Sequence, residues 1–187
     1  MHKHHIFIDD IDVVIVSHAH IDHNCDVAAL SSLLYDFNKN KQRQEKVYND
    51  FLGYPASKNH TIDWFLDDAT INSNADILDL NHVHSLSELV SQSHVLLKSE
   101  TAALSVASFR TQHVRGSSDS YGLKFSFSTS EGNAIWGYTS DTAYFEELNN
   151  FLDGCDVLLL NISDIYVSDV VHAKPKGSHL GFTGCEK

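Results

Sequence analysis

Residues that usually divide small proteins into separate parts are scarce in this sequence. The 187 residues include only two prolines, Pro55 and Pro175, and no repeat or Pro/Gly-rich stretch separates one part of the chain from another. A chain of this length can bury a substantial core as one unit. We therefore expect a single domain over residues 1–187.

Cysteine is too scarce to build a disulfide framework. Cys25, Cys155 and Cys185 are odd in number and form no C-x-x-C pair. No apolar run is long enough to span a bilayer, and Met1 is followed by a charged, histidine-rich stretch rather than a signal peptide. These absences predict a protein of a reducing compartment, cytoplasmic and without membrane contact.

Positive charge is also scarce. Thirteen Lys and Arg against 25 Asp and Glu give a formal net charge of −12. The one basic run, Lys39–Lys46, is interrupted by polar residues and by Glu45, which is typical of a solvated helix face. Because proteins that bind long nucleic acids usually present a basic face, we do not expect a long nucleic acid as partner.

Metal-ligand side chains, in contrast, are concentrated in residues 17–24, S-H-A-H-I-D-H-N. A β-branched run at Ile11–Val16 predicts a buried strand before them, and Asp26 is a suitable N-cap for a helix after them. His-x-His can bring two imidazoles to one metal ion, and the following Asp-His can turn toward a second position. Histidine is frequent in this chain, but the group at 2–5 has neither a preceding strand nor an aspartate, and predicts no site.

Patterns further along the chain predict strands interleaved with helices. Leu123–Thr129 alternates apolar and polar residues, and Gly132-Asn133 would turn it into a second strand at Ala134–Tyr138. An α/β layered fold accommodates such an order of elements. The other expected elements are helices within 26–52, 85–90 and 142–150, a turn at 72–76, strands at 95–98 and 103–110, and a buried strand at 157–161.

Three ligand-type residues follow later predicted strands: His113, Asp141 and His179. Each alone is typical of a surface residue or a helix cap. In this order, after H-x-H-x-D-H at residues 18–23, they predict the remaining ligands of one metal site.

The seven ligand positions and their order resemble the metallo-β-lactamase superfamily from about Ile8 to the C-terminus. The resemblance implies an αββα sandwich with two divalent metal ions, zinc or alternatively manganese, at the edge of the sheets. It also implies that Asp22 orients a metal-activated hydroxide in catalysis. By the same resemblance His18, His20 and His113 hold one metal, Asp22, His23 and His179 hold the other, and Asp141 bridges them.

Two stretches narrow the resemblance within the superfamily. Residues 118–125 (S-D-S-Y-G-L-K-F) and 172–184 (H-A-K-P-K-G-S-H-L-G-F-T-G) are similar to segments of ribonuclease Z-like enzymes and of anti-Pycsar-type cyclic-nucleotide phosphodiesterases. A bridging Asp141 argues against antibiotic hydrolysis. Asn161 stands where ribonuclease Z enzymes have a histidine that assists the leaving group, which argues against tRNA 3′-processing because an amide cannot deliver a proton.

The leading hypothesis is therefore a phosphodiesterase that acts on a small nucleotide or cyclic nucleotide. A glyoxalase II-like thioesterase and a catalytically silent metal-binding protein stay open as alternatives. Candidate substrate contacts are Ser120, Tyr121, His172, Lys176 and Ser178.

Superfamily members usually have more strands at both ends than this chain has room for. Sixteen residues precede Ser17 and eight follow His179. We therefore expect the sandwich to lack N-terminal and C-terminal strands. An uncovered sheet edge favours association, so a homodimer is one alternative for covering it.

Overall fold

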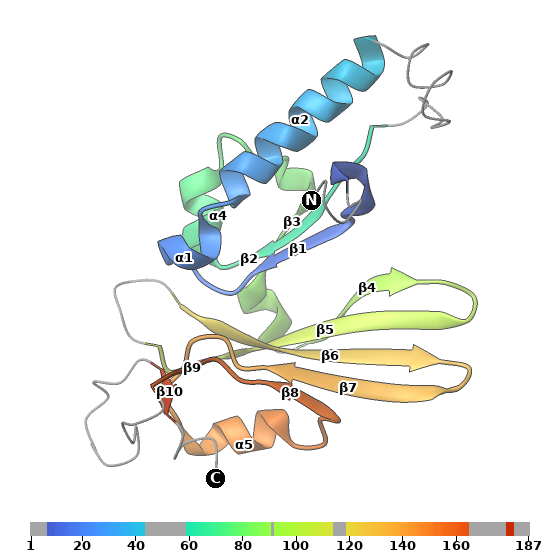
Figure 1. Ribbon diagram of the computed structural model, residues 1–187. Coiled ribbons are helices and arrows are strands. Elements are labelled where there is room, and N and C mark those ends of the chain that lie inside the picture. The colour runs from blue at the N-terminus through green and yellow to red at the C-terminus, as the bar shows by residue number, and fades with distance from the viewer. Residues whose placement is uncertain (1–6, 44–58, 91, 114–118, 165–178, 182–187) are drawn as a thin grey trace.

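The protein consists of two β-sheets that face each other, with helices on their outer sides (Figure 1). The computed structural model describes residues 7–43, 59–90, 92–113, 119–164 and 179–181. Helices α2 (Val27–Arg43) and α4 (Asp68–Asn74) cover one sheet, and α5 (Glu146–Leu152) covers the other. The expected α/β sandwich is thereby confirmed.

The first sheet has three parallel strands, in the order β1 (Val13–Val16), β2 (Asp63–Leu66) and β3 (Val83–Ser85). Side chains of β2 alternate between its two faces, as a strand covered on both sides requires. Trp64 and Leu66 pack with residues of α2, while Phe65 packs with Val106 and Leu123 of the facing sheet. The chain therefore has one core between the sheets and one beneath α2.

The second sheet has five strands and is antiparallel except for its last pair. The strands are, in order, β4 (His94–Lys98), β5 (Ala102–Arg110), β6 (Tyr121–Thr129), β7 (Gly132–Tyr138) and β8 (Val157–Leu159). The predicted hairpin pairing is confirmed, because β6 and β7 pair from Leu123↔Tyr138 to Thr129↔Gly132. Its turn lies at residues 130–131 rather than at the predicted Gly132-Asn133, which begin β7.

The predicted burial of the strand at 157–161 is wrong. Strand β8 ends at Leu159, and all three of its residues are exposed. It pairs with β7 alone, and the neighbouring Trp136 is also half exposed. An apolar strand is buried only where another layer lies above it, and β8 is an edge strand on the side of its sheet away from the three-stranded sheet (Figure 1).

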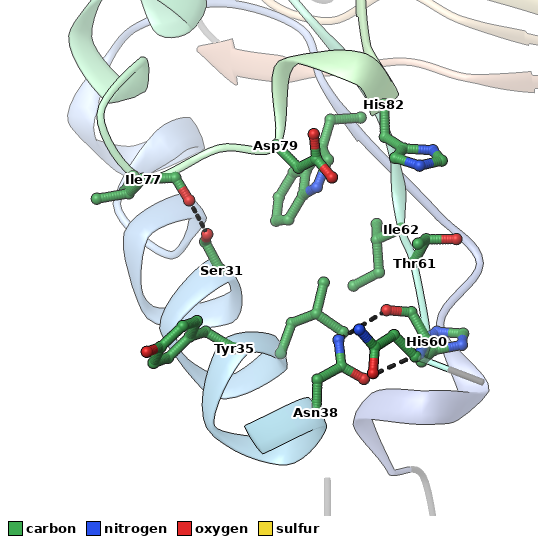
Figure 2. Close-up of a pocket in the computed structure, with 12 residues that line it drawn as sticks. Ser31, Tyr35, Asn38, His60, Thr61, Ile62, Ile77, Asp79 and His82 are labelled. Atoms are coloured by element: carbon green, nitrogen blue, oxygen red, sulfur yellow. Dashed lines mark hydrogen bonds between the residues drawn. The ribbon is translucent and has the colours of Figure 1, made fainter. Parts of the chain in front are cut away.

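Helix α2 is hydrogen-bonded at two points to segments that lead into strands of the first sheet, as Figure 2 shows. Ser31 Oγ donates a hydrogen bond to the carbonyl oxygen of Ile77 at 2.5 Å. Lower on the helix, the Asn38 side chain accepts from the main-chain N–H of His60 and donates to its carbonyl oxygen, both at 2.8 Å. A cavity of about 230 Å³ lies between these two links, with the buried Ile62 and Trp64 among its walls.

One helix prediction and one turn prediction need adjustment. The helix expected within 26–52 is described as α2 up to Arg43, and residues 44–58 lie outside the described part of the chain. The turn expected at 72–76 is wrong at its start, because α4 continues to Asn74. Asp67 begins α4 by accepting hydrogen bonds from the main-chain N–H groups of Ala69 and Thr70.

Shorter elements complete the described chain. No helix among the described residues is long and apolar enough to cross a membrane. The short elements are α1 (Ile21–Asn24), the 3₁₀ helices η2 (Ile8–Asp10), η3 (Leu80–His82) and η4 (Leu86–Val90), and the parallel pair β9 (Ile162–Asp164) and β10 (Leu180–Gly181).

One edge of the sandwich collects the ends of strands from both sheets. The main-chain N–H of Tyr121, at the start of β6, donates to the carbonyl oxygen of Ser17, just after β1. Gln112, just after β5, forms an isolated β-bridge with Ala143 in the segment that follows β7. These links bring three strand-end segments together, and these segments carry the predicted ligands.

Candidate metal centre

Histidine and aspartate side chains converge at this edge of the sandwich. His18, His20, His113 and Asp141 offer ligand atoms that all lie within 4.8 Å of one another, and three of these residues are buried, with His20 half-buried. His20 Nδ1 is hydrogen-bonded to His18 Nε2 at 3.1 Å and to His113 Nε2 at 2.9 Å. His18 and Asp141, the first and last of these four residues, lie 123 positions apart in the sequence, so only the fold brings them together.

A single oxygen of Asp141 lies among four imidazoles. Its Oδ2 is 3.6 Å from Nε2 of His18 and of His113, and 3.5 Å from His23 Nε2 and from His179 Nδ1. The Asp141 carboxylate is almost fully buried. Oδ2 thus lies next to histidines of both predicted ligand sets, and the bridging role of Asp141 stays a prediction.

His179 supplies a test of whether the site fits a metal. Its Nδ1 atom is buried and has no hydrogen-bond partner in the described part of the structure. Buried polar atoms are almost always paired, since an unpaired one destabilises the fold by about 1–3 kcal/mol. A nitrogen lone pair directed among other imidazoles and a carboxylate is a suitable ligand for zinc or a similar divalent ion. The residues present therefore fit the metal site that the sequence predicts.

The protonation state of His18 also suits a ligand. Burial and, after it, the positive charges that His23, His113 and His20 can carry together lower its pKa from 6.5 to about 3. Imidazole binds metals only in its neutral form. His18 Nδ1 is hydrogen-bonded to Ser17 Oγ at 3.1 Å, so Nε2 faces the cluster.

Asp22 lies at the mouth of the site rather than inside it. Its carboxylate is 75% exposed, and its Oδ2 is 3.7 Å from His23 Nε2. A hydrogen bond from its own main chain is the first cause that lowers the pKa of this carboxyl group. The mouth opens onto a pocket of about 350 Å³ lined by His20, Ile21, Asp22, His113, Asp141 and His179.

The structure brings the five predicted histidines together around Asp141, with Asp22 beside them at the rim. The predicted substrate contacts are placed differently. Ser120 is buried and its hydroxyl donates to the main-chain oxygen of Asp141 at 3.2 Å. Tyr121 is buried too, its hydroxyl donates to Asp119 at 3.3 Å, and burial raises its pKa to about 12. Their contact with substrate stays a prediction.

Three other predicted substrate contacts, His172, Lys176 and Ser178, lie outside the described residues.

Sequence reasoning missed the residues that hold Asp141 in place. Thr111 Oγ1 donates to the main-chain oxygen of Asp141 at 2.9 Å. The Asn161 side chain donates to Asp141 Oδ1. Ser140 has a φ of 53°, which is uncommon for a residue other than glycine, and directs the chain into the site. Thr111 directly follows β5 and Asn161 lies two residues after β8, so their positions alone could have indicated them.

Comparisons with known proteins agree with this geometry. The family model described as the beta-lactamase superfamily domain matches residues 2–181. A search of curated protein sequences gives no match. Among solved structures, the metallo-beta-lactamase fold protein YhfI from Bacillus subtilis is similar with a TM-score of 0.58 and 20% identity, over 96% of this chain and 59% of YhfI. The chain thus spans about three fifths of the length of YhfI.

The short form of human tRNase Z (ELAC1) is also similar, with a TM-score of 0.49 and 15% identity, over 97% of this chain and 68% of that protein. The likeness to YhfI shows the fold, and the family model covers nearly the whole chain. With its two facing sheets, outer helices and buried histidine–aspartate cluster, the chain belongs to the beta-lactamase superfamily.

Proposed function

We propose that this protein is a metal-dependent hydrolase whose substrates are phosphodiesters of nucleotide size, cyclic nucleotides included. The observation that carries the proposal is the convergence of four imidazole nitrogens on one carboxylate oxygen beside an open pocket. Nitrogen and carboxylate donors together suit two divalent ions, zinc or alternatively manganese.

Divalent ions bound in this cluster would act as Lewis acids toward a phosphoryl oxygen and lower the pKa of a water molecule. The chain's own residues prepare the site for this chemistry. Neutral imidazoles such as His18 present lone pairs, and Asp141 supplies the buried negative charge. Asp22, exposed at the pocket mouth, can orient the attacking water and accept its proton.

The size and charge of the pocket support a small phosphodiester. A volume of about 350 Å³ lies within the range of sites for small molecules. Its described lining contains no Lys or Arg, so among the described residues the positive charge offered to a phosphate would come from cations bound by the cluster. The net charge of −12 disfavours a long polyanion, which would need contacts well beyond the pocket.

Asn161 supports the same choice of substrate. Its side-chain N–H is engaged with Asp141, so it is not placed as a donor to a leaving group. Substrates whose leaving oxygen needs little protonation by the protein are then favoured, and strained cyclic diesters are of this kind.

The test is turnover of bis-p-nitrophenyl phosphate with added Zn²⁺ or Mn²⁺, together with metal content by mass spectrometry. Asp141→Ala should abolish turnover and lower metal content. Asp36→Ala, which removes an exposed carboxylate from α2, should leave both unchanged. Bound metal with hydrolysis of a thioester but not of the phosphodiester would replace the proposal by the thioesterase alternative. Absence of bound metal in the wild-type protein would refute it.

A further inference from the structure

We propose that Asn161 is a positioning residue that fixes the carboxylate of Asp141 for metal binding, an inference that rests on the proposed metal-dependent function. Asn161 Nδ2 donates a hydrogen bond to Asp141 Oδ1. The other oxygen, Oδ2, is the one that lies 3.5–3.6 Å from the nitrogens of four histidines. Asn161 thereby determines which carboxylate oxygen faces the ligands.

The main chain of Asn161 is itself held in place. Strands β7 and β8 run parallel. Just after β7, the N–H of Thr139 donates to the carbonyl oxygen of Leu159, the last residue of β8, at 3.1 Å. The N–H of Asn161 then donates to Thr139 Oγ1 at 3.0 Å. Because Asn161 is tied to the segment that leads to Asp141, their contact is part of the sheet's geometry rather than a meeting of two loose side chains.

The backbone of Asp141 is fixed independently. Its carbonyl oxygen accepts from Thr111 Oγ1 at 2.9 Å and from Ser120 Oγ at 3.2 Å. With the main chain fixed, the side chain can still turn about its two torsions, and the last of these is intrinsically broad. An amide N–H restricts that rotation without adding a charge, so the negative charge of Asp141 stays available to a cation.

The test compares Asn161→Leu with wild type in the full-length chain. Leucine keeps the branched shape of asparagine but donates no hydrogen bond, and position 161 is only half-buried. Asn161→Ala provides a second variant in case leucine impairs folding, and thermal melts of the metal-free proteins check the fold. The matched control is Asn149→Leu in α5, which removes a side-chain amide that donates a hydrogen bond to the Tyr144 hydroxyl at 3.2 Å.

The first measurement is Zn²⁺ and Mn²⁺ affinity by competition with a chelator, supplemented by the visible absorption of bound Co²⁺. Loss of a group that orients a metal ligand typically weakens metal binding about 10–100-fold, and we expect a loss in this range for Asn161→Leu. Asn149→Leu should bind metal as wild type does. In an Asp141→Ala background, Asn161→Leu should cause no additional loss, because Asn161 acts through Asp141.

Wild-type metal affinity in Asn161→Leu, or an equal loss in the Asp141→Ala background, would overturn the positioning role. These readouts do not depend on any substrate. If the wild-type protein binds metal and responds to Asn161→Leu as expected but hydrolyses no phosphodiester, the positioning role stands and the proposed substrate class fails.

Discussion

Substitution of Gly122 by alanine should destabilise the protein, because the new methyl group has no space. Gly122 in β6 pairs with Phe109 in β5, and a Cβ at Gly122 would lie 2.2 Å from Cζ and 2.4 Å from Cε2 of the Phe109 ring. Carbon atoms in contact normally lie about 3.5–4.0 Å apart, so the ring or the strand must move by more than 1 Å.

The Phe109 ring cannot move away easily. It is 2% exposed and stacks on Phe151 with ring centroids 4.8 Å apart and an interplanar angle of 8°. Leu148 and Leu180 belong to the same buried cluster. Overpacking of this kind costs about 1–3 kcal/mol, more than the few tenths to 1 kcal/mol that alanine gains over glycine in a strand.

The assay is equilibrium urea unfolding followed by tryptophan fluorescence, with thermal melts beside it. Gly122→Ala should lower the free energy of unfolding by about 1–2 kcal/mol net, which is roughly 2–8 °C in Tm for a chain of this size. Gly137→Ala is the control: its nearest atoms are Leu152 Cδ2 at 2.8 Å and Leu158 Cδ2 at 3.0 Å, the ends of flexible side chains. It should therefore lose less stability than Gly122→Ala.

Relief of the contact provides a further check on this reasoning. Phe109→Ala creates a cavity and is destabilising by itself, but it removes the ring that a Cβ at Gly122 would meet. In that background Gly122→Ala should cost nothing more, so the two substitutions should be non-additive by at least about 1 kcal/mol. A wild-type stability for Gly122→Ala, or strict additivity with Phe109→Ala, would refute the overpacking argument.

Three further predictions concern charge and exposure. Burial and, after it, the charges that neighbouring histidines can carry hold the pKa of His18 at about 3 in the folded state, against an ordinary 6.5. The unfolded chain therefore binds the extra proton between these values, and the urea midpoint of the metal-free protein should fall as pH falls through this range, less steeply in His18→Asn. Asp67→Asn keeps an acceptor for the N–H of Thr70 and removes a carboxylate whose pKa burial raises. At pH 7 this variant should be at least as stable as wild type. Asp67→Ala, which removes the acceptor, should lose about 1–2 kcal/mol in urea unfolding. Trp136 and Val157, paired across β7 and β8 and exposed by 51% and 44%, predict concentration-dependent association in sedimentation experiments, which Trp136→Lys should reduce.

The histidine–aspartate cluster could be predicted from the sequence because the pattern that carries it is local. His18, His20 and His23 follow one strand at fixed spacing, and His113 and Asp141 each come a few residues after another strand. Strands that end at the same edge of a sandwich bring such residues together, so order and spacing were sufficient. The hairpin of β6 and β7 is local in the same sense, since alternation and a turn define it.

Burial of β8 could not be predicted in this way. The apolar residues Val157, Leu158 and Leu159 are typical of a strand covered on both faces. Whether they are covered depends on which part of the other sheet lies above them, a relation between segments far apart in the sequence. The start of the turn expected at 72–76 was wrong for a different reason. Asparagine and serine at 72–74 favour a turn, but the cap at Asp67 begins a helix, α4, that continues through them.

Ser140 shows most clearly why a site's fine geometry is hidden from sequence analysis. Glycine and asparagine, not serine, are the usual residues at a positive φ, so nothing in T-S-D predicts one. Such a conformation costs about 1–3 kcal/mol and persists only where the surroundings over-determine it. Here the neighbouring Thr139 is bonded to the segment after β8, and Asp141 is bonded through both its main chain and its carboxylate. The strained residue thus directly precedes the carboxylate that faces four histidines, which indicates that local stability is given up to orient the ligand.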